Sequence, residues 1–255
     1  RRYIIILAVD AENRFAGPFR EEILAWLDRV IRIMMEKAKG HKQTAIIVIL
    51  LSVIAAVILI GFYLQNQPPR LYPGEVREYR GENLSAIDNL DENAIRGNQN
   101  VDQSKYRLTV NGLVNDSMEY TYEQVVNGFQ SYEKVVTLYC VEGWNAKILW
   151  QGVLVRDVLN QAGVKATAKV VIFHAADDYT TAMPLSYFYE HDIIIAYKVN
   201  GLVLPPEKGF PFELVAESKY GYKWIKWITQ IELSDNENYL GYWESSGFSN
   251  DADVP

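Results

Sequence analysis

One uncharged apolar run constrains this 255-residue chain more than any other feature. Residues 45–64 are 20 consecutive positions without a charged side chain, and Ser52 and Tyr63 are the only clearly polar members. A helix rises 1.5 Å per residue, so this run spans about 30 Å, the thickness of the hydrocarbon core of a bilayer. The run therefore predicts a transmembrane helix over 45–64. A buried helix of a soluble domain is the alternative interpretation.

The charge of the chain divides at this run. Residues 1–64 carry 9 Lys/Arg and 6 Asp/Glu, a net charge of +3, whereas residues 65–255 carry 16 and 26, a net charge of −10. The positive-inside bias predicts a cytoplasmic N-terminus and an extracytoplasmic C-terminal domain in a single-pass protein of the cell membrane. A C-terminal domain that faces the cytoplasm is the alternative. The overall net charge of −7 argues against a nucleic-acid partner, which would require a basic surface.

The pattern of apolar and turn-forming residues predicts four regions. Residues 1–44 form a short cytoplasmic segment with a strand over 3–9 and an amphipathic helix over 19–37. Residues 45–64 form the membrane span, 65–75 a linker and 76–255 the globular domain. Within that domain, strands are expected at 106–110, 134–139, 169–173, 179–183, 193–199, 202–204, 212–215 and 227–233.

Two helices and two hairpins complete the expected α+β domain. A capping box of Thr121 and Gln124 opens a helix through Val126, and a second helix over 153–162 ends at Gly163. Asn-Gly turns at 111–112 and 200–201 predict the hairpins, the first returning over 113–114. Many short strands with few helices indicate a mixed, strand-rich α+β class.

The single cysteine is a candidate functional residue. One Cys excludes an intrachain disulfide, a CxxC redox pair and a zinc site with two thiolates. Cys140 follows the apolar strand and precedes Gly143, a context that presents sulfur to a cavity. A buried inert thiol, a nucleophile and a soft-metal ligand all stay open at this point. The chain has only three histidines, so a Cys-His hydrolase has little support.

A second candidate is a basic and aromatic stretch over residues 219–227. Lys219, Lys223 and Lys226 alternate with aromatic residues there, although the domain as a whole is acidic. Such lysines neutralise a phosphate as point charges, while aromatic rings and backbone amides line a flat heterocycle. A solvated lysine face beside a core strand is the alternative.

Five ordered motifs together resemble one known family. They are TLYCVEGWNAKILWQGV (137–153), DDYTTAMPL (177–185), NGLVLPPEKGFPFELV (200–215), KYGYKWIKWI (219–228) and GYWESSGFSNDADV (241–254). This set resembles the molybdopterin-binding domain of the sulfite oxidase family, in its prokaryotic branch with the periplasmic methionine-sulfoxide reductases. The resemblance covers roughly residues 76–255. It implies a sulfite-oxidase-type, strand-rich α+β fold.

The resemblance also implies a cofactor and its ligands. The expected cofactor is molybdenum-molybdopterin, with one metal ion, one pterin and one protein thiolate. Cys140 falls on the position of the metal ligand, and Glu142 falls where a carboxylate lies near the metal. The expected cofactor-binding residues are Asn93, Arg96, His174, Ala175, Lys208, Lys219, Tyr220, Lys223, Trp224, Ile225 and Lys226. Glu213 stands where the family has an arginine, which removes a cation from the expected site.

The implied function is that of a membrane-anchored oxidoreductase. It transfers an oxygen atom to or from a small substrate of the sulfite or S-oxide type. The expected electron-transfer partner is a cytochrome or a quinone-linked protein, because no motif for a second redox centre is present. The alternative is a non-catalytic binding module that keeps the fold without turnover, and Glu213 favours it.

Overall fold

The computed structural model describes residues 28–29, 32, 41–65, 68–91 and 93–255. The chain divides into two compact units, residues 1–68 and 69–255. The strand predicted over 3–9 lies outside the described residues. Of the helix predicted over 19–37, only positions 28, 29 and 32 are described, and all three are helical.

The apolar run forms one helix, α3 (His41–Gln65), of 25 residues. Most of its described side chains are exposed, with Ile49 at 62% and Leu59 at 67%. Ser52 satisfies its hydroxyl within the helix by donating to the carbonyl of Val48 at 2.8 Å, one turn earlier. Judged on the described residues alone, no helix has both the length and the apolarity needed to cross a membrane. The membrane span over 45–64 stays a prediction.

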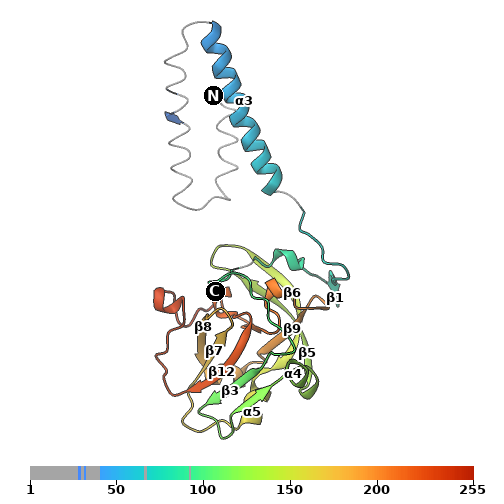
Figure 1. Cartoon of the computed structure of the whole chain (residues 1–255), viewed down its shortest axis with the longest axis vertical. Coiled ribbons are helices and arrows are strands. Elements are labelled where there is room, and N and C mark those ends of the chain that lie inside the picture. The colour runs from blue at the N-terminus through green and yellow to red at the C-terminus, as the bar shows by residue number, and fades with distance from the viewer. Residues whose placement is uncertain (1–27, 30–31, 33–40, 66–67, 92) are drawn as a thin grey trace. The chain divides into compact units, whose positions relative to one another are not determined.

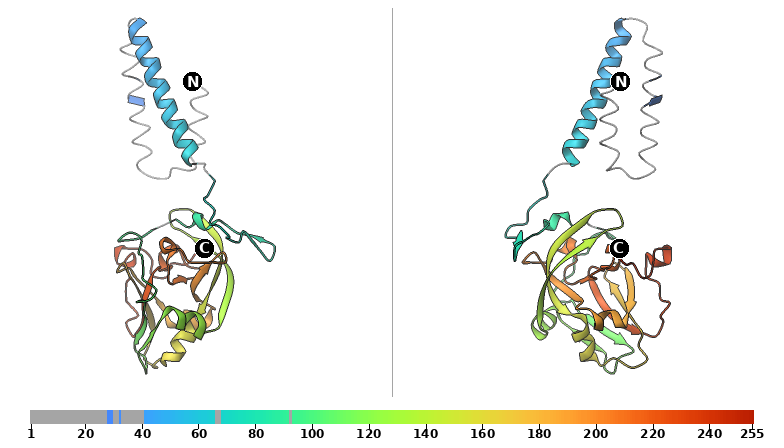
Figure 2. Two further views of the ribbon diagram at one scale, coloured as in Figure 1. Left: turned by 45° about the vertical axis from the view of Figure 1, so that its right-hand side comes forward. Right: turned by 180° about the vertical axis from the view of Figure 1, so that it is seen from behind.

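The larger unit contains two five-stranded sheets and a two-stranded one (Figure 1). The first five-stranded sheet has the order β10-β9-β6-β5, and β11 also pairs with β9. Its members are β5 (Ser131–Tyr139), β6 (Asn145–Leu154), β9 (Ile194–Val199), β10 (Leu202–Val203) and β11 (Glu213–Val215). All of its pairings are antiparallel. The long β5–β6 hairpin is the yellow-green ribbon in both views of Figure 2.

The second five-stranded sheet has the order β4-β3-β12-β7-β8. Its members are β3 (Leu108–Gly112), β4 (Met118–Tyr120), β7 (Val170–Ala175), β8 (Thr180–Pro184) and β12 (Ile228–Ser234). Strand β12 pairs in parallel with β3 and antiparallel with β7. The two-stranded sheet is formed by β1 (Glu78–Tyr79) and β2 (Glu82–Asn83).

Short helices join the strands, and one apolar core connects both large sheets. The helices are α4 (Tyr122–Gly128), α5 (Val155–Ala162), α6 (Leu185–Glu190), η1 (Ile87–Asn89), η2 (Pro206–Lys208), η3 (Gly221–Lys223) and η4 (Glu244–Ser246). Trp150 of β6, Phe173 of β7 and Phe188 of α6 are fully buried in that core. Burial of such large aromatic side chains supplies much of the free energy that holds the sheets together.

The strand-rich α+β class is confirmed, and so is the capping box of α4. The hydroxyl of Thr121 accepts from the backbone N–H of Gln124, and the Gln124 side chain accepts from the N–H of Thr121. The hairpin after 111–112 differs from the prediction, because the chain returns through β4 at 118–120 rather than through 113–114. Residues 113–114 instead contact the neighbouring strand and the loop after α5. Strand β6 and helix α6 were not predicted.

Candidate active site

Cys140 lies in the five-residue loop 140–144 that joins β5 to β6. The last strand pair is Tyr139 with Asn145, so the thiol comes directly after the end of the ladder. The backbone N–H of Cys140 donates to the carbonyl of Trp144 at 3.0 Å, and its carbonyl accepts from the N–H of Gly143 at 3.1 Å. Gly143 has φ +94°, a conformation that favours glycine. The tight loop therefore fixes the direction of the thiol from both sides.

The carboxylate of Glu142 lies beside this thiol. One of its oxygens is 3.8 Å from Cys140 Sγ, 3.3 Å from the indole nitrogen of Trp144 and 3.4 Å from the amide nitrogen of Asn93. Burial raises the pKa of the Cys140 thiol, and the negative charge of Glu142 raises it further. Three donors thus converge on one carboxylate oxygen, which holds Glu142 next to the sulfur.

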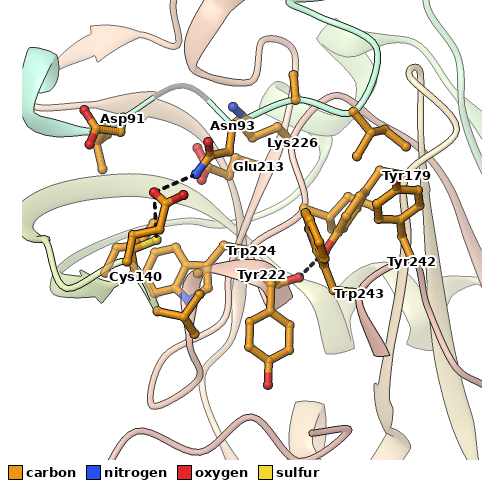
Figure 3. A pocket seen from close by; sticks show the side chains of 18 of the residues that line it. Asp91, Asn93, Cys140, Tyr179, Glu213, Tyr222, Trp224, Lys226, Tyr242 and Trp243 are labelled. Carbon is orange, nitrogen blue, oxygen red and sulfur yellow. Dashed lines mark hydrogen bonds between the residues drawn. The ribbon is translucent and has the colours of Figure 1, made fainter. Parts of the chain in front are cut away.

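A cavity of about 500 Å³ opens in front of the thiol (Figure 3). This volume lies within the range of roughly 300–1,000 Å³ that is typical of cofactor sites. Most of the wall comes from residues 90–91 and 93–95, the β5–β6 loop, Lys208 with Glu213, and residues 221–222 and 224–227. Its charged lining groups are Asp91, Glu142, Asp177, Glu213, Lys208 and Lys226.

The structure brings seven of the thirteen predicted site residues to this cavity. They are Asn93, Cys140, Glu142, Lys208, Trp224, Ile225 and Lys226. The indole of Trp224 is buried and donates to the carbonyl of Lys219 at 2.9 Å, which fixes its plane. The ammonium of Lys226 lies 4.5 Å from the centre of the Trp227 ring. Lys208 is buried and donates to the carbonyl of Leu90.

The other six predicted residues do not line the cavity. Arg96 is exposed and pairs with Asp178. On β7, His174 pairs with Glu232 of β12 at 2.9 Å, and Ala175 is buried in the strand. Strand alternation explains the position of His174, because its ring points to the opposite face of the sheet from its neighbours Phe173 and Ala175, which pack in the core.

Lys219 and Tyr220 are held by the C-terminal segment. Lys219 pairs with Asp253, and the N–H of Tyr220 donates to the carbonyl of Ala252 at 2.8 Å. A further bond joins the N–H of Val254 to the carbonyl of Ser218 at 3.0 Å. These contacts fasten the start of the loop that carries Trp224 into the cavity wall.

Lys223 is completely buried and forms an ion pair with Glu244, whose side chain is equally buried. Its ammonium also donates to the carbonyl of Ala182 at 2.9 Å and to the amide oxygen of Asn250 at 3.1 Å. Burial lowers the pKa of Lys223, and the contact with Glu244 opposes this shift. With all three ammonium hydrogens engaged, Lys223 supports the cavity from behind rather than facing it.

An aromatic arm of the cavity was missed as a site by the sequence reasoning. It consists of Tyr179, Tyr222, Tyr242, Trp243 and Phe248. Their rings contact one another at centroid distances of 5.3–5.8 Å, and the hydroxyl of Tyr179 donates to the carbonyl of Tyr222. Four of these residues belong to the family motifs 177–185 and 241–254. Their membership of those motifs could have marked them as site residues, but the sequence analysis gave them no role.

The residues at this cavity fit a molybdopterin. A thiol that becomes a thiolate is the soft ligand that such a metal centre needs. The ammonium groups of Lys208 and Lys226 suit a phosphate, and the fixed indole of Trp224 suits a flat ring system. The donor set therefore matches a cofactor with a metal, an anionic group and a heterocycle.

Comparison with known proteins gives the family. Residues 96–243 match the model of the oxidoreductase molybdopterin-binding domain. The chain therefore belongs to this family, and it is a molybdopterin-dependent oxidoreductase of the sulfite oxidase type.

Two relatives cover the same region. The oxidoreductase YuiH of Bacillus subtilis is 39% identical over 148 residues, which are 58% of this chain and 74% of YuiH. YedZ1 of Azospira oryzae, whose name describes a protein-methionine-sulfoxide reductase subunit, is 34% identical over 149 residues. That match covers 58% of this chain and 56% of YedZ1.

A more distant relative and a solved structure extend the comparison. A nitrate reductase of Hordeum vulgare is 32% identical over 172 residues, which cover 55% of this chain and 19% of that enzyme. The crystal structure of the sulfane dehydrogenase SoxCD from Paracoccus pantotrophus matches with a TM-score of 0.54 and 20% identity, over 68% of this chain and 52% of that one. This last likeness shows the shared fold.

Proposed function

We propose that this protein transfers an oxygen atom to or from a small, uncharged or weakly charged substrate of the S-oxide type. The observation that carries the proposal is the Cys140 thiol at the cavity with the Glu142 carboxylate 3.8 Å away. When bound, the molybdenum centre supplies two-electron redox chemistry and accepts or releases the oxygen atom. In the reducing direction the balance is R₂SO + 2 H⁺ + 2 e⁻ → R₂S + H₂O.

The residues of the chain supply the protons and the binding site. Glu142 is exposed and its carboxylate lies 3.8 Å from the sulfur of Cys140, which supports a role as the group that would donate or accept a proton during turnover. The cavity carries four carboxyl groups and two lysines, a balance that disfavours a strongly anionic substrate such as sulfite. The relative named as a methionine-sulfoxide reductase subunit supports an S-oxide.

The test is a substrate panel on the full chain, purified from a host that makes the cofactor. Molybdenum content is measured first, followed by turnover of S-oxides, sulfite and nitrate with artificial electron donors and acceptors. We expect one molybdenum per chain and highest turnover with an S-oxide. Cys140→Ser is expected to abolish both metal retention and turnover, and unchanged values would contradict the ligand assignment. Molybdenum without turnover of any substrate would favour the non-catalytic binding module instead.

We also propose that residues 45–64 anchor the protein in the cell membrane, with the C-terminal domain outside the cytoplasm. The uncharged run of 20 residues and the basic residues before it support this arrangement. The full chain should stay in the membrane pellet after alkaline carbonate washing, and protease added to intact spheroplasts should digest residues 69–255. Release by carbonate would contradict the anchor, and protection from protease would contradict the orientation. An external cytochrome or quinone-linked protein then exchanges electrons with the site.

A further inference from the structure

Glu213 is a buried carboxyl that faces the cavity. It is the first residue of β11, only 4% of its surface is exposed, and it lines the same cavity as Cys140 (Figure 3). Among the described residues, no hydrogen bond and no ion pair within 4 Å reaches its carboxyl group. Within the part of the chain that the structure describes, the fully buried side-chain oxygens without a partner are those of Tyr120 and Glu244, so the carboxyl oxygens of Glu213 open into the cavity. A group bound in the cavity can therefore reach and satisfy them.

The backbone around Glu213 holds it close to a cation. Gly209 has φ +111°, and a Cβ there would lie 3.1 Å from Lys226 Cγ and 3.3 Å from Glu213 Cβ. The missing side chain at Gly209 therefore lets Lys226 and Glu213 pack against the same turn. Burial raises the pKa of Glu213 to about 8, while the charges of Lys226 and Lys208 act in the opposite direction. The other acids at the cavity are Asp91, Glu142 and Asp177.

The chemistry of a carboxylate restricts the ligand. Its two oxygens accept hydrogen bonds, so a ligand group with two adjacent donors matches it best. A phosphate offers only acceptors and repels a carboxylate, and an S-oxide oxygen is also an acceptor. The aminopyrimidinone edge of a pterin presents a ring N–H beside an exocyclic NH₂, a pair of parallel donors similar to the fork of arginine.

We propose that this donor edge of the pterin binds the ionised carboxylate of Glu213 through two parallel hydrogen bonds. The inference rests on molybdopterin binding in this cavity and adds the contact that orients the ring. A carboxylate here does not weaken the cofactor site, although the sequence resemblance predicts an arginine at this position. Glu213 instead binds the same cofactor through hydrogen bonds that the pterin donates to a carboxylate.

The test measures pterin retention rather than turnover. Full-length wild-type and variant proteins from a cofactor-competent host are incubated at raised temperature, and pterin released through an ultrafilter is followed by its fluorescence after oxidation. We expect Glu213→Gln to release pterin about ten-fold faster than wild type, since losing one charge-assisted hydrogen bond costs about that factor. Glu213→Arg should release it faster still, because donors would then face donors. Glu237→Gln, an exposed change, is the control and should behave as wild type.

The outcomes separate the two proposals. Wild-type protein without molybdenum and pterin would overturn cofactor binding itself. If wild-type protein holds the cofactor and Glu213→Gln releases pterin at the same rate, only the role of Glu213 is overturned. Slower pterin release from Glu213→Arg would also overturn that role, because it would indicate that an anionic group of the cofactor lies beside residue 213. Circular dichroism checks the folding of each variant. If Glu213→Gln does not fold, Glu213→Asp replaces it, because aspartate keeps the charge on a shorter side chain. We again expect faster pterin release than from wild type, and an unchanged release rate would contradict the proposal.

Discussion

The ammonium of Lys223 and the carboxylate of Glu244 form an ion pair from which solvent is completely excluded. The same carboxylate oxygen accepts from the hydroxyl of Thr181 at 2.7 Å, while the other oxygen has no partner among the described residues. Removing one member of a buried pair leaves the other charge uncompensated, which is more costly than never burying the pair.

Lys223→Met should therefore lower the free energy of unfolding by about 3–5 kcal/mol. The double variant Lys223→Met with Glu244→Gln should recover part of that loss, because no unpaired charge remains. Urea unfolding followed by tryptophan fluorescence measures both. Lys105→Met, at an exposed pair with Asp102, is the control and should change little. Equal losses in the single and double variants would refute the coupling.

The buried carboxyl of Glu213 predicts a pH dependence of stability in the cofactor-free protein. Its pKa is about 8 in the folded chain, against an ordinary value of 4.5, so the folded state holds the proton more tightly than the unfolded state. The stabilisation that the protonated Glu213 gives the folded state is complete below pH 4.5 and is lost as the pH rises towards 8. Over that range the free energy of unfolding falls by at most about 1.4 kcal/mol per pH unit. Denaturation at pH 5, 6, 7 and 8 should show this slope in wild type and a smaller one in Glu213→Gln. Parallel curves would contradict it.

The contacts of Glu142 predict an effect on turnover without an effect on folding. Glu142→Gln should keep molybdenum and stability but lower turnover by roughly 10²–10⁴-fold, the usual contribution of a positioned acid or base. Trp144→Phe removes the indole donor 3.3 Å from the carboxylate, so a loss of about ten-fold is expected. Steady-state kinetics and metal analysis check both variants, and a fully active Glu142→Gln would remove Glu142 from the mechanism.

Gly152 predicts a steric limit at the centre of the first sheet. A Cβ at this position of β6 would lie 2.2 Å from the carbonyl oxygen of Ile195 and 2.7 Å from Cα of Ala196. Gly152→Ala should therefore destabilise the domain by about 1–3 kcal/mol, as overpacking does. Gly128→Ala, where a Cβ meets nothing within 4 Å, is the matched control. Equal melting temperatures for the two variants would show that the sheet absorbs the added methyl group.

Local sequence signals predicted the elements that depend on local chemistry. The capping box of Thr121 and Gln124 fixed the start of α4, and Asn200-Gly201 placed the β9–β10 hairpin. Strand β6 was missed because its burial does not alternate: Ile148, Leu149 and Trp150 are all buried in succession. Gln151 and Gly152 follow this run at the point where the pairing of β6 with β9 shifts register, and that irregularity depends on a partner distant in sequence.

In the candidate site, too, local sequence patterns do not predict features that depend on contacts with distant parts of the chain. Cys140 lines the cavity, as does part of the basic stretch, but the three lysines of that stretch lie in three different environments. Lys219 pairs with the C-terminal segment, Lys223 is buried behind the wall, and Lys226 lines the cavity. The 3₁₀ turn η3 redirects the chain between Lys219 and Lys223, so neither helical nor strand periodicity predicts where each of these side chains points.

The fastening of loop 218–220 by residues 252–254 has a consequence for biosynthesis. A ribosome delivers the chain from its N-terminus, so the thiol of Cys140 emerges more than a hundred residues before this fastening segment. Until residues 252–254 have been translated, the loop that carries Trp224 lacks its anchor and the wall of the cavity is incomplete. We therefore expect the cofactor to be inserted after translation, and a nascent chain stalled before residue 252 should not retain molybdopterin.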